Sequence, residues 1–157
     1  MKESVFVLCV LAVTVYLAVA AWEDHKTCEV TRWKHLVGGI PAAFLLCTRY
    51  SQHSWQEYAM VLTFAILFVL AGYKGAYGVA DGLVFANLTL FFGSIGGLAG
   101  SGVVILIMIV AAFSFLICHV FRCVVKHKKI RNMAGALIPH ILVGYMTVFV
   151  VILFHII

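Results

Sequence analysis

Asp24 and Asp81 are the residues whose types and positions are best suited to chemistry, and they are the only aspartates in the chain. Each lies within about one helical turn of a long apolar run, where a carboxylate is costly to desolvate and is often functional when retained. Two carboxylates at close range cannot both ionise readily, so the pair supplies an acid and a base together. The chemistry available to such a pair is aspartyl proteolysis, in which one carboxylate activates water and the other protonates the scissile carbonyl.

Both aspartates also have a simpler structural interpretation. Asp81 can be the N-cap of a helix that starts at Gly82, because aspartate accepts a hydrogen bond from the free N–H groups of a first helical turn. Asp24 can be an interfacial loop charge that Lys26 balances. Position alone leaves these interpretations open.

The elements that must position the aspartates are membrane helices. Of the 157 residues, 64% are apolar and 11% are charged, against roughly 45–50% and 25% in a soluble domain. The mean hydropathy is +1.11, which excludes a soluble fold, a disordered chain and a large aqueous domain. Apolar runs cover residues 5–22, 36–48, 58–72, 83–100, 103–118 and 133–157. They predict an all-α, polytopic membrane protein, a single domain over 1–157 with six transmembrane helices.

Two details of this architecture follow from the same runs. The second and third runs are short for a span, so either flanking residues such as Trp33, His35 and Tyr50 extend them or these helices lie in thinned membrane. The tight turn between the fourth and fifth runs is expected where small residues let helices approach closely. The glycines that cluster there are Gly93, Gly96, Gly97, Gly100 and Gly102.

The charges predict the orientation. If all six runs span, the loops alternate sides, and only Lys2 and Arg49 of the 11 cations fall on one side. The positive-inside rule then places the other nine cations on the cytoplasmic side of the cell membrane. Both termini of this multi-pass protein are therefore expected outside the cytoplasm. Two spans separate Asp24, after the first run, from Asp81, before the fourth, so both face the cytoplasm and can meet. The net charge of +5 therefore reflects topology and contact with the lipid bilayer, and no nucleic acid is expected as a partner.

Two further patterns bear on the chain's class. Residues 1–21 share features with a cleavable signal peptide, but Glu3 directly follows Lys2 and the apolar stretch is long, which favours an uncleaved first helix. The five cysteines contain no C-x-x-C pair, and the histidines have no spacing typical of ligands. No metal and no cofactor are therefore expected.

The residues around both aspartates resemble motifs of the type IV prepilin leader peptidases, which are membrane aspartyl proteases. The segment DHKTCEVTRW, from Asp24 to Trp33, is similar to the family's first motif, with Thr31 and Arg32 in place of its proline and asparagine. The segment GVAD, from Gly78 to Asp81, is similar to the G-x-G-D motif, with Ala80 replacing the second glycine. A basic loop followed by ALIPHILVG, over 136–144, looks like the family's entry to the last helix.

The resemblance implies six helices, Asp24 and Asp81 as the catalytic pair, and cleavage of the basic leader of pilin-like precursors. It also implies a short form of the family, because the loop over 22–35 has no room for the methyltransferase insertion of larger members. Four further residues are expected near the substrate. Gly78 and Ala80 leave room beside Asp81 for an extended chain, and Glu23 and Glu29 can attract a basic leader.

Other functions stay open at this point. A small transporter or channel could use the same aspartates to bind a cation or a proton, although such sites usually lie near the membrane midplane. An inactive assembly subunit would tolerate the loss of both aspartates. Asn87 and Thr89, in the fourth run, are expected to form hydrogen bonds between helices rather than to contact substrate.

Overall fold

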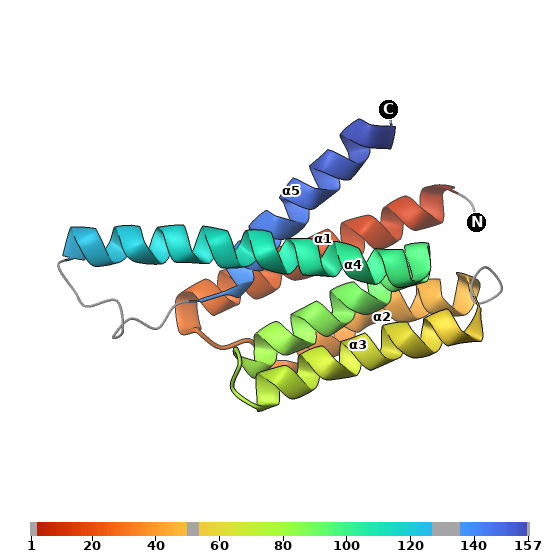
Figure 1. Ribbon diagram of the computed structural model, residues 1–157, viewed down its shortest axis with the longest axis horizontal. Helices are drawn as coiled ribbons and strands as arrows, with labels where there is room; N and C mark the ends of the chain where they lie inside the picture. The colour runs from red at the N-terminus through yellow and green to blue at the C-terminus, as the bar shows by residue number, and fades with distance from the viewer. Residues whose placement is uncertain (1–2, 50–53, 127–135, 157) are drawn as a thin grey trace.

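The computed structural model describes residues 3–49, 54–126 and 136–156, and all regular structure in these ranges is helical (Figure 1). No strand occurs in them, as the all-α prediction requires. The elements are α1 (Glu3–Thr27), α2 (Arg32–Arg49), α3 (Trp55–Tyr73), α4 (Val79–Lys126) and α5 (Ile138–Ile156).

Helix α4 consists of two helical halves that meet at a break. Gly96 has φ −124° and ψ 16°, and Gly97 has φ 57° and ψ −132°, so neither is helical. The positive φ of Gly97 is readily adopted only by glycine. The break thus lies within the glycine cluster where the tight turn was expected, and Gly100 already belongs to the returning half. A Cβ atom at Gly100 would overlap the carbonyl group of Phe92, so its glycine allows the two halves to pack closely.

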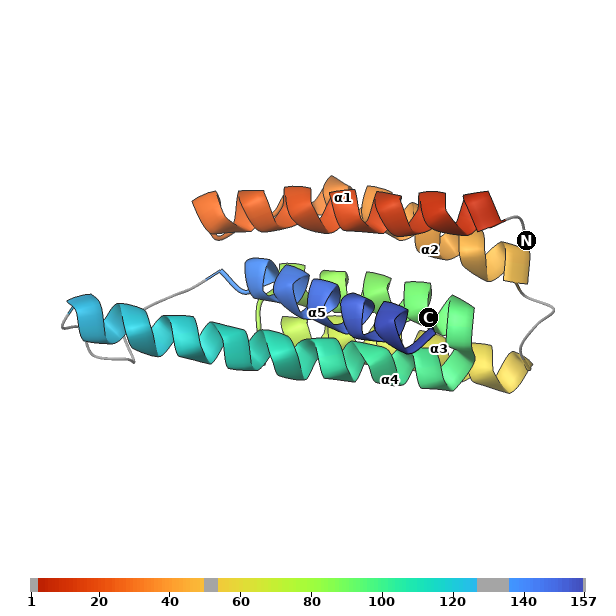
Figure 2. The same ribbon diagram turned by 90° about the horizontal axis from the view of Figure 1, so that it is seen from above.

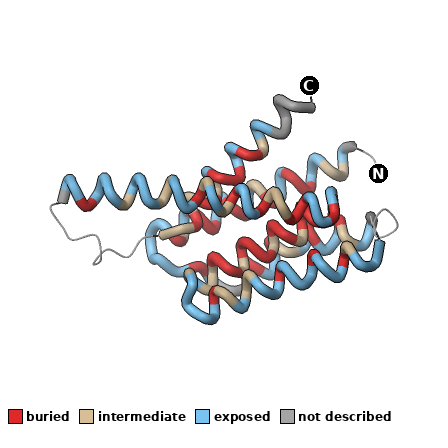
Figure 3. Tube along the Cα trace, viewed as in Figure 1, coloured by how far each residue is buried: buried red, intermediate tan, exposed pale blue. Residues whose placement is uncertain are grey.

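The helices form two layers, and α4 lies in one of them (Figure 2). Figure 2 shows α1 and α2 side by side in one layer, with α3, α4 and α5 in the other. Helix α4 contacts α2, α3 and α5, while α1 contacts α2 and α5. Buried residues lie where the helices face one another (Figure 3), and the core includes Leu17, Leu45, Phe85, Leu88, Ile107 and Ile141.

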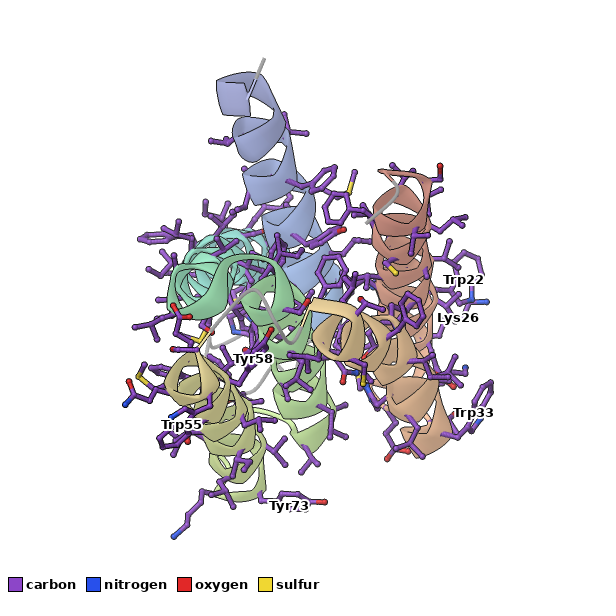
Figure 4. All side chains as sticks on the ribbon, turned by 90° about the vertical axis from the view of Figure 1, so that its right-hand side faces the viewer. Trp22, Lys26, Trp33, Trp55, Tyr58 and Tyr73 are labelled. Carbon is purple, nitrogen blue, oxygen red and sulfur yellow. The ribbon has the colours of Figure 1, made fainter. Side chains whose placement is uncertain are left out.

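The outer surface of the bundle is apolar. Three helical segments are long and apolar enough to cross a membrane, namely Ser4–Thr27, Trp55–Tyr73 and Val79–Val125, and the third contains the break in α4. Figure 4 shows Trp22, Trp33, Trp55 and Tyr73 pointing away from the bundle, while Tyr58 points into it. Exposed tryptophan and tyrosine near helix ends are typical of membrane–water interfaces. The fold is thus compatible with a membrane protein.

The helix ends differ from those predicted. Helices α1 and α4 extend beyond their apolar runs, so Asp24 lies inside α1 and Asp81 inside α4, not in the loops where the sequence placed them. Helix α5 begins at Ile138 rather than at 133, and residues 133–135 lie outside the described ranges. Helix α2 includes Trp33 and His35, which confirms their expected role in extending it. Tyr50 lies outside the described residues.

Candidate functional site

A cavity of about 580 Å³ lies at the end of the bundle where α1 and α3 end and α2 and α4 begin. In Figure 1 this is the end opposite the break in α4. The residues lining the cavity come from these four helices, their connections and Leu137, just before α5. They include Asp24, Glu29, His35, Gly78, Ala80 and Asp81. The structure thus brings both aspartates to one site, together with three of the four residues expected near the substrate.

Asp24 lies in the last turn of α1 and its residue is only 6% exposed. Its Oδ2 accepts a hydrogen bond of 2.9 Å from the main-chain N–H of Ile138, the first residue of α5. That N–H is one of the groups that a helix start leaves without a partner, and the negative charge of the carboxylate favours the same position. The interpretation of Asp24 as a loop charge balanced by Lys26 is therefore wrong. The ammonium group of Lys26 instead lies 4.2 Å from the centre of the Trp22 ring.

Asp81 is the third residue of α4 and is 8% exposed. Its Oδ2 accepts a hydrogen bond of 3.1 Å from the main-chain N–H of Gly78, which directly precedes the helix. Asp81 is thus not the N-cap. It occupies the position three residues later, from which an acidic side chain returns to the N-cap backbone, as in half of a capping box. A Cβ atom at Gly78 would lie 2.8 Å from Oδ2 of Asp81, so a larger residue at this position would displace the carboxylate.

The two carboxylates line the same cavity, and the negative charge of Asp24 is near enough to act on Asp81. The start of α4, which carries Asp81, is held against α3 by Tyr77, whose hydroxyl donates a hydrogen bond of 2.8 Å to the carbonyl of Phe68. Burial raises the pKa of the Tyr77 hydroxyl, and the charge of Asp81 raises that pKa further, so Tyr77 keeps its proton and remains a donor. Two coupled carboxylates beside an open volume can hold a water molecule and move protons to and from it.

The two glutamates expected to bind a basic leader have different surroundings. Glu29 is exposed and lines the cavity. Glu23 is not among the lining residues, and its carboxylate binds the ammonium group of Lys34 at 2.8 Å and the hydroxyl of Thr31 at 2.7 Å. Glu23 therefore fixes the connection between α1 and α2. Its binding of a leader stays a prediction.

Sequence reasoning missed His35 as a cavity residue. It is 4% exposed, and its Nδ1 lies 2.8 Å from the hydroxyl of Tyr16. Asn87 donates a hydrogen bond of 2.9 Å to the main-chain carbonyl of His35, which confirms that Asn87 links helices. The same prediction for Thr89 is wrong, because its hydroxyl donates to the carbonyl of Phe85 in its own helix. The only feature of the sequence that could have indicated this cluster is the presence of a histidine and an asparagine in apolar helices.

Within the described ranges, no group of three or more histidine, cysteine, aspartate or glutamate side chains is arranged to hold a metal ion. Comparisons of the chain with protein-family models, with curated proteins and with solved structures find no match. Function is therefore inferred from the cavity and from the side chains that line it.

Proposed function

We propose that the chain is a membrane aspartyl endopeptidase that removes the basic leader of pilin-like precursors at the cytoplasmic membrane face. One observation carries the proposal: Asp24 and Asp81, which are distant in sequence and lie on different helices, line one cavity. A structural role for each carboxylate alone would not require them to share an open volume. The resemblance of the segments around them to prepilin peptidase motifs supplies the substrate class.

The proposed reaction is the hydrolysis of one peptide bond. One carboxylate takes a proton from water while the water oxygen bonds to the scissile carbonyl carbon, and the other carboxyl group donates its proton to the carbonyl oxygen. The C–N bond of the resulting diol then breaks, and its nitrogen takes a proton to leave as the new amino terminus. Oδ2 of each aspartate is held by a main-chain N–H, and in the proposal the Oδ1 atoms hold the water. The residues require no metal and no covalent intermediate.

The proposed topology has six spans with both termini outside the cytoplasm. The two halves of α4 each cross the membrane, and α1, α2, α3 and α5 supply the other four spans. This arrangement puts the aspartate cavity and most cations at one edge of the bilayer, in agreement with the positive-inside rule. The cations with described side chains that then face the cytoplasm are Lys26, Lys34, Lys74 and Arg122.

The proposed substrate enters at the mouth of the cavity. The exposed carboxylate of Glu29 offers the complement of a basic leader. Gly78 and Ala80 are small, which leaves the backbone beside Asp81 open to an extended chain. Only residues 28–31 separate α1 from α2, so we expect leader cleavage without methylation of the new amino terminus.

Co-expression with a panel of pilin-like precursors tests the proposal. The leader is followed by the mass shift of each precursor, with the wild type, Asp24→Asn and Asp81→Asn side by side. Glu3→Gln is the matched control, because it removes one negative charge at the other end of α1. We expect cleavage by the wild type and the control and none by either aspartate variant. Cleavage by a folded aspartate variant would refute the proposal, and an inert but folded wild type would favour transport or assembly.

A further inference from the structure

Buried Tyr16 and His35 and half-buried Asn87 form a polar cluster beside the aspartate cavity. The three residues come from α1, α2 and α4 respectively. The Tyr16 hydroxyl lies 2.8 Å from His35 Nδ1, and the Asn87 amide nitrogen lies 3.4 Å from that hydroxyl and 2.9 Å from the His35 carbonyl. His35 alone of the three lines the cavity. The cluster therefore joins the cavity to the contact of three helices.

The hydrogen bonds favour one of the two ring nitrogens of His35 as the one that carries the proton. The amide of Asn87 donates its two hydrogens to the His35 carbonyl and to the Tyr16 oxygen. The Tyr16 oxygen is thus an acceptor, and its own proton is free to be donated to Nδ1 of His35. The opposite arrangement would place a second donor on the Tyr16 oxygen and leave a buried hydroxyl proton unused, which is unfavourable. In the neutral ring the proton then resides on Nε2.

The geometry of α2 keeps this arrangement rigid. A Cβ atom at Gly38 would lie 2.5 Å from the ring of Tyr16, so glycine at this position lets the ring pack directly on the helix. The rings of Tyr16 and His35 meet edge to face, with their centres 6.1 Å apart. The imidazole is therefore held from behind by contacts that do not use Nε2.

Nε2 of His35 is the feature that the fold leaves unexplained. It is buried and has no hydrogen-bond partner among the described residues. A buried donor without a partner is disfavoured, and in native proteins such a group is explained by strain, by a functional role or by a bound water or ion. His35 also lines the same cavity as Asp24 and Asp81. Because Nε2 itself is closed off in this structure, a partner from the cavity requires a small movement of the imidazole toward the occupant.

We propose that His35 is a substrate-binding residue whose Nε2–H donates a hydrogen bond to a main-chain carbonyl oxygen of the precursor segment in the cavity. This inference rests on the peptidase function proposed above. An extended peptide presents carbonyl oxygens along its length, and a neutral donor suits a neutral acceptor. Tyr16 and Asn87 are positioning residues, because they act on substrate only through the ring of His35.

The test uses two substitutions that separate the nitrogens. His35→Asn keeps polar atoms near Nδ1 and removes Nε2, whereas His35→Gln places an amide nitrogen near Nε2. A peptide spanning the leader and cleavage site of a processed precursor is titrated against the full-length protein in nanodiscs, in an Asp81→Asn background that prevents cleavage. The KM and kcat for the intact precursor are measured without that background. Tyr16→Phe is a third variant, and His119→Asn, away from the cavity, is the matched control.

We expect His35→Asn to raise both Kd and KM about five- to tenfold with little change in kcat, the size of one lost hydrogen bond. His35→Gln keeps a donor near Nε2 but loses the contact with Tyr16, so His35→Gln and Tyr16→Phe are each expected to raise Kd about two- to threefold, while the control stays within about twofold of the parent. Unchanged Kd and KM in folded His35→Asn, with wild-type cleavage intact, would overturn the role of His35 and leave the peptidase proposal standing. No cleavage by the wild type and no peptide binding would overturn both.

Discussion

Asp24 has a structural contact that can be separated from its proposed chemistry. Its Oδ2 accepts the N–H of Ile138 at 2.9 Å, and the Ile138 residue is fully buried. Asp24→Asn keeps an oxygen that can accept this hydrogen bond and loses only the negative charge. Asp24→Ala removes the acceptor and leaves a buried N–H at the start of α5. The two variants should therefore differ in stability and agree in activity.

The magnitudes follow from the two contributions. A buried donor left without a partner costs about 1–3 kcal/mol, so Asp24→Ala should lower the free energy of unfolding by about that amount. A charge beside a helix start contributes about 0.3–1 kcal/mol. Asp24→Asn should thus remain within about 1 kcal/mol of the wild type. Both variants should lack peptidase activity.

Unfolding in mixed micelles with increasing SDS, followed by tryptophan fluorescence, measures these free energies. Leader cleavage by the same preparations is measured in parallel. An Asp24→Ala protein as stable as Asp24→Asn would show that the carboxylate does not hold the start of α5. Activity in Asp24→Asn would show that the charge is not needed for the reaction.

Three other predictions follow from the structure. Glu29→Gln should raise KM for basic leaders and weaken the salt dependence of KM, whereas Glu3→Gln at the far end of α1 should change neither. Equal salt dependence of KM in the two variants would contradict a leader-binding role for Glu29. Tyr77→Phe should lower the free energy of unfolding by about 1 kcal/mol, because the hydrogen bond to the Phe68 carbonyl is lost, and an unchanged SDS midpoint would refute this. Gly144→Ala should destabilise the protein by about 1–3 kcal/mol, because the new Cβ atom would lie 2.6 Å from a main-chain oxygen of α4. Wild-type stability of this variant would show that α4 and α5 can move apart at no cost.

The shared location of Asp24 and Asp81 was predictable from the sequence because it depends only on the parity of spans. An even number of helices between two residues returns the chain to the same end of the bundle, whatever the exact helix ends. Those ends were predicted less well, because the polar residues after Trp22 continue α1 through Thr27. Asp24 therefore lies within α1 and is buried. Its hydrogen-bond partner is Ile138, the first residue of α5, a helix that the apolar run predicted to begin at residue 133.

The surroundings of His35 were not predictable. Its partners, Tyr16 and Asn87, lie on two other helices, and no local spacing connects them. The expectation that Asn87 links helices was correct because an amide in an apolar helix needs a partner. Thr89 did not require one elsewhere, since a threonine hydroxyl can bond to the carbonyl four residues earlier in its own helix. Which polar residue reaches across a helix contact depends on packing that a single sequence does not specify.

The central claim, that Asp24 and Asp81 form one catalytic pair, is tested most directly by a double-mutant comparison in purified protein. The kcat/KM for one precursor is measured in nanodiscs for the wild type, Asp24→Asn, Asp81→Asn and the double variant. Residues that act as one unit lose most activity with the first substitution, so each single variant should fall by about 10⁴-fold or more and the double variant should fall no further. A folded single variant with near wild-type kcat/KM, or losses that multiply in the double variant, would contradict the account.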